Sequence, residues 1–218
     1  MPGAITQDIE LIEAGHGGGV TPPAGGGDEG GSSSGGPRPV PRRAYFTALQ
    51  LGLAAIIMFF MSLASSYIVR KGLGTDWQRT RLPRVLWFNT VILLASSITI
   101  VIARRKLERG LLASFRNWWW LTTGLGVLFL AGQLAAWRDL RLNGMFLSSN
   151  PSSSFFYVLT AAHGAHLAGG IFALFYVLFR NWDRSRITQA TAAELTSIYW
   201  HFMDGLWIFL FVLLTVGR

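Results

Sequence analysis

The sequence contains no cysteine among its 218 residues. Disulfides, zinc–thiolate sites, iron–sulfur clusters and thioether-attached c-type haem are therefore excluded. Charge is also scarce, because Asp, Glu, Lys and Arg make up 14% of the chain, whereas soluble domains carry about 25%. So few charges cannot cover a water-exposed surface, and 51% of the residues are hydrophobic. The composition indicates a protein whose solvent is largely lipid.

The net charge of +8 does not indicate a nucleic-acid-binding protein. Nucleic-acid binding requires Lys and Arg on one continuous face. Here they lie in the short segments between apolar runs, where basic residues are typical of topology determinants. We therefore expect no nucleic-acid partner.

Residues 1–41 are low in complexity and rich in Gly, Ser and Pro. Such a composition cannot bury enough apolar surface to offset the conformational entropy lost on folding. The sequence therefore predicts a disordered tail over 1–41 and a transmembrane domain over 42–218.

Five apolar runs follow this tail, at about 44–69, 84–103, 118–137, 155–180 and 196–216. Each run reaches or nearly reaches the ~20 residues that a helix needs to cross ~30 Å of hydrocarbon. An open strand would leave its backbone polar groups unsatisfied in lipid, so helix is the expected state. The predicted fold class is an all-α membrane protein, a bundle of five transmembrane helices.

Lys and Arg are shared unequally between the two sides of this predicted bundle. The tail, the second loop and the fourth loop carry eleven of them, and the first loop, the third loop and the C-terminus carry eight. Cytoplasmic segments carry the excess of Lys and Arg. The sequence thus predicts a cytoplasmic N-terminus and a C-terminus outside a plasma membrane.

Four ionisable residues lie inside the last two predicted helices. The fourth helix carries His163 and His166, and the fifth carries His201 and Asp204. Each pair has a spacing that puts both side chains on one helix face. Counting 1.5 Å per residue from opposite sides of the membrane gives His166 and Asp204 similar depths. We expect these two to meet across the helix pair, with His163 and His201 above and below.

This polar cluster has three interpretations. It can be structural, an interhelical hydrogen-bond cluster worth ~0.6 to 2 kcal/mol per bond. It can be a proton or lipid-headgroup site, since intramembrane ionisable groups often mark such sites. It can also be a metal or haem site, because His and carboxylate bind zinc and iron, but this spacing alone is weak evidence.

Other residues predict contacts between helices. Small residues at every fourth position let a neighbouring helix approach closely. In the fourth predicted helix these residues are Ala161, Ala165 and Gly169. Polar residues in the second and third predicted helices are expected to form interhelical hydrogen bonds. They are Asn89, Ser96 and Gln133.

Several motifs resemble one membrane protein family. The segment Tyr199-Trp200-His201-Phe202-Met203-Asp204 resembles the last-helix signature of subunit III of haem–copper cytochrome c oxidases. The segment His163-Gly164-Ala165-His166 resembles the preceding histidine motif of that family. Weaker matches in the two helices before it include Asn89, Gln133 and Trp137. The resemblance runs in order from about 44 to 216.

This resemblance implies an accessory role in a bacterial respiratory enzyme. Members of the family carry no haem or copper and pack against catalytic subunit I, with subunit II in the same complex. They bind phospholipid, support proton uptake and protect the oxygen-reducing centre. The resemblance therefore implies no cofactor in this chain, bound phospholipid, and haem and copper in its partners. The complex would oxidise cytochrome c, reduce O2 and pump protons.

One position departs from the family pattern. Aligning on Met58-Phe59-Phe60 puts Ile56 where the family usually has a buried Glu or Asp. This departure keeps open a subunit-III-like companion of a nitric oxide reductase. Two hypotheses from other classes are a b-type haem-binding membrane cytochrome that uses the histidines, and a small transporter.

Overall fold

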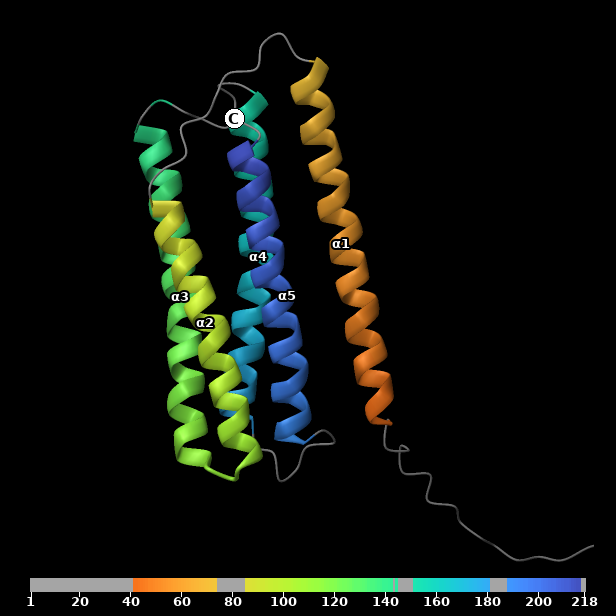
Figure 1. The fold of residues 1–218 in the computed structure, drawn as a ribbon, viewed down its shortest axis with the longest axis vertical. Helices are drawn as coiled ribbons and strands as arrows, with labels where there is room; N and C mark the ends of the chain where they lie inside the picture. The colour runs from red at the N-terminus through yellow and green to blue at the C-terminus, as the bar shows by residue number, and fades with distance from the viewer. Residues whose placement is uncertain (1–40, 74–84, 143, 145–150, 181–187, 217–218) are drawn as a thin grey trace, which may run out of the picture. The chain divides into compact units, whose positions relative to one another are not determined.

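The computed structural model describes residues 41–73, 85–142, 144, 151–180 and 188–216. Within them lie five helices, each long and apolar enough to cross a membrane. Their bounds are α1 Arg42–Leu73, α2 Val85–Glu108, α3 Leu112–Leu142, α4 Pro151–Phe179 and α5 Gln189–Val216 (Figure 1). The predicted fold class is confirmed. The predicted disordered tail over 1–41 lies, apart from Pro41, outside the described residues and stays a prediction.

The helices mostly extend beyond the predicted apolar runs. Helix α3 begins at Leu112 instead of 118, and α5 begins at Gln189 instead of 196. A hydropathy pattern marks the segment that crosses hydrocarbon, whereas helical hydrogen bonds continue into the polar headgroup layer. The tryptophan run 118–120 consequently lies inside α3 and not at its first turn.

Local sequence signals explain where several helices begin and end. Helix α4 begins at Pro151, whose fixed φ and missing N–H suit a first helical position. Helix α2 ends at a turn through Gly110, which has φ 72°, a conformation that glycine adopts without strain. The Leu111 N–H there donates to the Lys106 carbonyl at 3.0 Å. This tight turn makes α2 and α3 antiparallel neighbours.

Four of the helices form a closed ring. Helix α2 packs against α3, α3 against α4, α4 against α5, and α5 against α2. Helix α1 lies outside this ring, and Figure 1 shows its ribbon set apart from the other four. Its contacts are with α4 and α5. Few α1 side chains are buried, namely Phe60, Ala64 and Tyr67.

Large aromatic side chains fill the centre of the ring. Trp119, Phe129, Trp200 and Trp207 are all fully buried or nearly so. Their bulk requires facing residues to be small, and a Cβ added at Gly126 would lie 2.6 Å from the Trp200 ring. Apolar side chains also cover the outside of the helices, as expected of a surface that faces lipid.

The contact of Gly132 on α3 with Asn89 on α2 gives a first testable prediction. A methyl group at residue 132 would lie 2.1 Å from Asn89 Oδ1, so Gly132→Ala must displace the buried Asn89 amide. We expect a loss of about 1–3 kcal/mol of stability, the usual effect of overpacking. The measurement is the unfolding midpoint in detergent, followed by circular dichroism.

Gly124→Ala on the same helix is the matched control. A Cβ at residue 124 meets nothing within 4 Å, and alanine favours helix over glycine by up to ~1 kcal/mol. Gly124→Ala should therefore keep or raise the midpoint. Equal midpoints for the two variants would show that the α2–α3 contact is looser than described.

Candidate functional site

A line of hydrogen bonds joins α2 to α5 through the two buried tryptophans of α5. The Trp207 Nε1–H donates to Thr90 Oγ1 at 3.1 Å, and the Trp200 Nε1–H donates to Ser96 Oγ at 2.9 Å. The two tryptophans are seven residues apart and so lie on the same face of α5. Each indole N–H thus finds an acceptor inside the apolar core, which a buried donor requires.

His201 and Asp204 of α5 also face α2. A hydrogen bond of 2.6 Å joins Ser97 Oγ to His201 Nδ1. Asp204 is 4% exposed and neither carboxyl oxygen has a hydrogen-bond partner, although Ser97 lies beside it. We call these contacting residues the α2–α5 seam: Thr90, Ser96 and Ser97 on α2, and Trp200, His201, Asp204 and Trp207 on α5.

His163 lies in the centre of the helix ring and is fully buried. Its ring contacts Phe129 of α3 and Trp207 of α5, with centroid distances of 5.9 and 5.1 Å. Neither ring nitrogen has a hydrogen-bond partner. His163 therefore packs as an aromatic ring in this structure.

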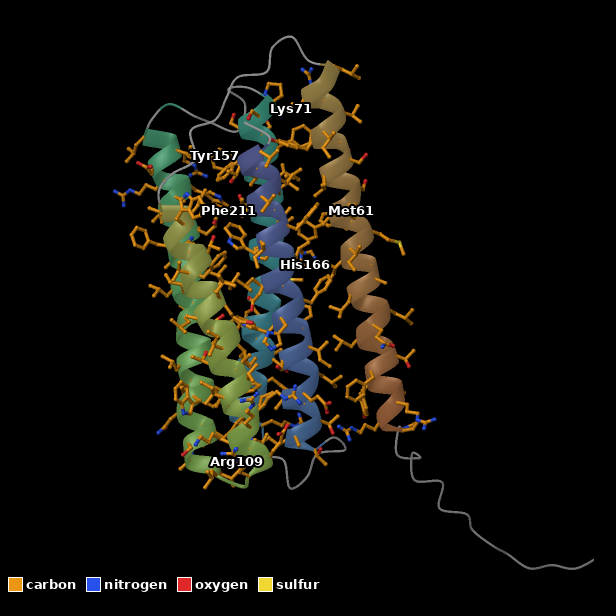
Figure 2. The ribbon with its side chains drawn as sticks, viewed as in Figure 1. Met61, Lys71, Arg109, Tyr157, His166 and Phe211 are labelled. Atoms are coloured by element: carbon orange, nitrogen blue, oxygen red, sulfur yellow. The ribbon has the colours of Figure 1, made fainter. Side chains whose placement is uncertain are left out.

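His166 faces a different neighbour. It is half-buried, and its ring contacts Phe60 and Phe59 of α1 at 5.5 and 6.1 Å. Its Nδ1 bonds with the Ala162 carbonyl of its own helix at 2.8 Å. Its backbone carbonyl accepts a hydrogen bond of 2.8 Å from the Tyr199 hydroxyl. Figure 2 shows His166 between the α4–α5 pair and α1.

The expected meeting of His166 and Asp204 does not occur. The contacts of His163 with Trp207 and of Gly170 with Trp200 put residues 166 and 204 at the same level. At that level His166 turns toward α1, whereas Asp204 turns toward α2. Counting residues along two helices determines depth, but the rotation of each helix about its axis decides which side chains meet.

The small residues of α4 also lie elsewhere than expected. Ala161, Ala165 and Gly169 are exposed along the outer face of α4. The close approach of α5 occurs one position further on, at Gly170, where an added Cβ would lie 3.3 Å from the Trp200 ring. The four-residue spacing of small residues predicts a packing face on α4, but the face that contacts α5 is one residue further around the helix.

The polar residues of α2 and α3 that were expected to form interhelical hydrogen bonds differ in whether they do so. Ser96 accepts from Trp200, and Asn89 Nδ2 donates to the Phe129 carbonyl at 3.5 Å, so both bond across helices. Gln133 is buried, but neither polar atom of its side chain has a partner. Ile56 packs half-buried against the core. Thr90 and Ser97 directly follow the predicted positions Asn89 and Ser96, and their partners come from α5.

His163 and His166 thus occupy separate environments, whereas His201 and Asp204 share the α2–α5 seam. Among the described residues no three His, Asp or Glu side chains lie close enough to hold a metal ion. The fold and site define a multi-pass membrane protein whose buried polar groups connect helices. A family model described as "Cytochrome c oxidase subunit III" matches residues 47–216. The chain belongs to the cytochrome c oxidase subunit III family.

Relatives from several bacteria cover most of the transmembrane domain. A "Cytochrome c oxidase subunit 3" of Corynebacterium diphtheriae is 37% identical over 169 residues, covering 73% of this chain and 82% of the relative. A "Probable cytochrome c oxidase subunit 3" of Mycobacterium tuberculosis is 34% identical, covering 74% and 82%. A "Cytochrome c oxidase subunit 3" of Thermostichus vulcanus is 30% identical, covering 73% and 80%. The family resemblance predicted from the motifs is confirmed.

The different surroundings of two histidines give a second prediction. His201→Phe removes the bond to Ser97 and should cost about 0.6–2 kcal/mol, as for other hydrogen bonds between membrane helices. His163→Phe removes no hydrogen bond and keeps an aromatic ring against Phe129 and Trp207, so it should cost less. The measurement is the unfolding midpoint of each variant in detergent. A larger loss for His163→Phe would show that His163 has a hydrogen-bond partner.

Proposed function

We propose that this chain is the non-catalytic subunit III of a bacterial haem–copper oxidase. It packs against catalytic subunit I in a complex that also holds subunit II. The observation that carries the proposal is the family match over residues 47–216, which includes helices α2 to α5 and all of α1 but its first five residues. In this role the chain supports assembly, lipid packing and stability of the enzyme that oxidises cytochrome c, reduces O2 and pumps protons.

The arrangement of polar residues supports a role without its own cofactor. His163, His166 and His201 turn toward Trp207, Phe60 and Ser97 respectively. A b-type haem held between two histidines needs both imidazoles directed at one iron. We therefore place the haem and copper in the partner subunits. The nitric oxide reductase companion, the b-type cytochrome and the transporter are not favoured by the family match.

The exposed helix surface supports the proposed partners. Helix α1 exposes most of its length, and Met58 is 70% exposed. Helix α4 also exposes Phe172 and the small residues Ala161, Ala165 and Gly169. A surface this apolar needs lipid or another membrane subunit to cover it. We propose that subunit I and bound phospholipid share this surface.

Membrane topology is the second part of the proposal. The described ends of α2 and α3 nearest their shared turn carry Arg104, Arg105, Lys106, Arg109 and Arg116. This basic turn lies at the same end of the bundle as Arg42, because Arg42 and Arg104 line one cavity. Excess Lys and Arg favour the cytoplasmic side. We propose that α1 begins in the cytoplasm and that α5 ends outside a plasma membrane.

Copurification tests the proposed assembly. The affinity-tagged chain, extracted from its native membrane in mild detergent, should bring haem–copper subunits I and II with it. The readouts are mass spectrometry of the bands and the haem absorbance of the eluate. A chain recovered without haem–copper subunits would contradict the proposal. Haem retained by the chain after its partners are removed would instead support a b-type cytochrome.

Cysteine labelling tests the topology, since the chain has no cysteine of its own. Arg109→Cys lies at the turn between α2 and α3, which Figure 2 shows at one end of the bundle. Arg141→Cys lies near the end of α3 at the other side of the membrane. A membrane-impermeant maleimide should label Arg141→Cys in intact spheroplasts. It should label Arg109→Cys only after the membrane has been permeabilised. The reverse pattern would invert the proposed topology.

A further inference from the structure

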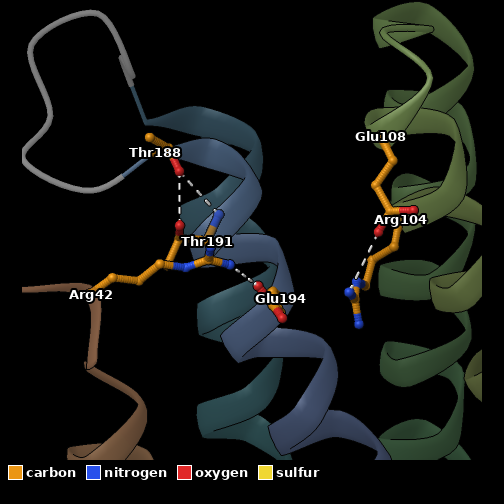
Figure 3. Close-up of polar contacts among 6 residues, drawn as sticks. All are labelled: Arg42, Arg104, Glu108, Thr188, Thr191 and Glu194. Atoms are coloured by element: carbon orange, nitrogen blue, oxygen red, sulfur yellow. Dashed lines mark hydrogen bonds and ion pairs between the residues drawn. The ribbon is translucent and has the colours of Figure 1, made fainter. Parts of the chain in front are cut away.

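A cavity opens at the end of the bundle where α1 and α5 begin and α2 ends. Its volume is about 280 Å³ and its lining includes Arg42, Arg104, Glu108 and Glu194. Figure 3 shows its charged side chains paired: Arg42 donates to Glu194 at 2.5 Å, and Arg104 lies 3.6 Å from Glu108. A space of this size with charged walls accommodates several water molecules.

Polar groups lead from this cavity into the α2–α5 seam. On α5, Glu194, Ser197, His201 and Asp204 follow one another at spacings of three and four residues, so they share a face. Ser197 is fully buried and its hydroxyl has no hydrogen-bond partner. Ten residues separate Glu194 from Asp204, which corresponds to ~15 Å along the helix. The face therefore runs from the headgroup level to the middle of the membrane.

Asp204 is the innermost group on this face and is not accounted for by packing. Its two carboxyl oxygens are buried without a donor. An ionised carboxylate is expensive in such a place, whereas a neutral carboxylic acid needs only an acceptor for its proton. Ser97 lies beside it as that acceptor, and the other side of Ser97 is bonded to His201 Nδ1.

We propose that Asp204 is a proton-binding carboxyl group that exchanges its proton with the cavity through Ser97 and His201. The proposal concerns this chain's own seam and goes beyond its role as a subunit. In the protonated state the Asp204 carboxyl donates to Ser97 Oγ, Ser97 donates to His201 Nδ1, and His201 carries its proton on Nε2.

Release of the proton reverses this chain of hydrogen bonds. Water on the cavity side takes the Nε2 proton, the Ser97 hydroxyl proton moves to Nδ1, and the Asp204 proton moves to Ser97 Oγ. One proton leaves, Asp204 becomes a carboxylate, and Ser97 then donates to it. In both end states the Ser97 hydroxyl donates one hydrogen bond and accepts another, because a serine hydroxyl can donate and accept at once.

The surroundings on every neighbouring helix are consistent with a single exchanging group. On α2, the charged residue near His201 is Arg104, which also lines the cavity. On α4, His163 is held between aromatic rings and His166 turns toward α1. On α1, the residues facing His166 are Phe59 and Phe60. Arg42 of α1 lines the cavity and pairs with Glu194.

Infrared spectroscopy of the affinity-purified full chain, with whatever subunits accompany it, tests this proposal. A protonated carboxyl gives a carbonyl stretching band outside the carboxylate region, and the band shifts on transfer to D2O as the proton exchanges. We expect one such band to be present in the wild type and absent from Asp204→Asn. A spectrum that Asp204→Asn leaves unchanged would overturn the proposal.

The relay is tested by the rate of that shift after mixing with D2O. Ser97→Ala should slow exchange of the Asp204 proton by about tenfold or more, because the path of the proton then lacks the hydroxyl that links Asp204 to His201. Ser97→Thr keeps a hydroxyl and should restore the rate. The matched control is Ser96→Ala, which removes the neighbouring hydroxyl, bonded to Trp200, and should leave the rate unchanged.

Two outcomes would overturn the relay. One is an unchanged exchange rate in Ser97→Ala, and the other is equal slowing in Ser97→Ala and Ser96→Ala. If Ser97→Ala fails to fold, His201→Phe removes the other relay group and is judged by the same rate. The subunit composition of the same preparation is read separately by mass spectrometry. Failure of the proton site is therefore distinguishable from failure of the proposed subunit role.

Discussion

The structure depends on the need to satisfy indole N–H groups where no water is available. Trp200 and Trp207 are buried in the centre of the ring, and each donates to a hydroxyl of α2. Trp119 of α3 does the same toward the Leu174 carbonyl of α4, at 3.0 Å. These bonds are directional, so they determine the rotation of each helix about its axis as well as its distance from its neighbour. Packing of apolar side chains against lipid-like neighbours provides no such constraint.

The sequence predicts the number of helices because length and hydropathy suffice to recognise a membrane span. It predicts depth nearly as well, since residues 166 and 204 do lie at one level. The sequence does not predict the rotation of each helix about its axis, because a helix with apolar residues on all sides has no hydrophobic stripe that identifies its inner face. Ala165 and Gly170 illustrate this: both are small, and only the contact with Trp200 distinguishes the packed one from the exposed one.

The candidate site shows the same limit at the level of motifs. His163, His166, His201 and Asp204 are neighbours in two short sequence motifs, but their side chains are directed to three different helices. The sequence locates these polar residues in the last two helices, whereas their partners come from other helices. Ser97 and Thr90 were the least predictable, because a serine or threonine in a membrane helix is common and acquires a role only from what faces it.

The peripheral place of α1 has a consequence for biogenesis. Helix α1 is synthesised before the other four described helices, but its contacts are with α4 and α5, and the ion pair of Arg42 is with Glu194, 152 residues later. The ring of α2 to α5 can close without it. During insertion α1 therefore lacks its native neighbours while α2 and α3 pair by their short turn, and it can dock fully only after α4 and α5 have been made. Among the five described helices, the earliest one made depends on the two made latest.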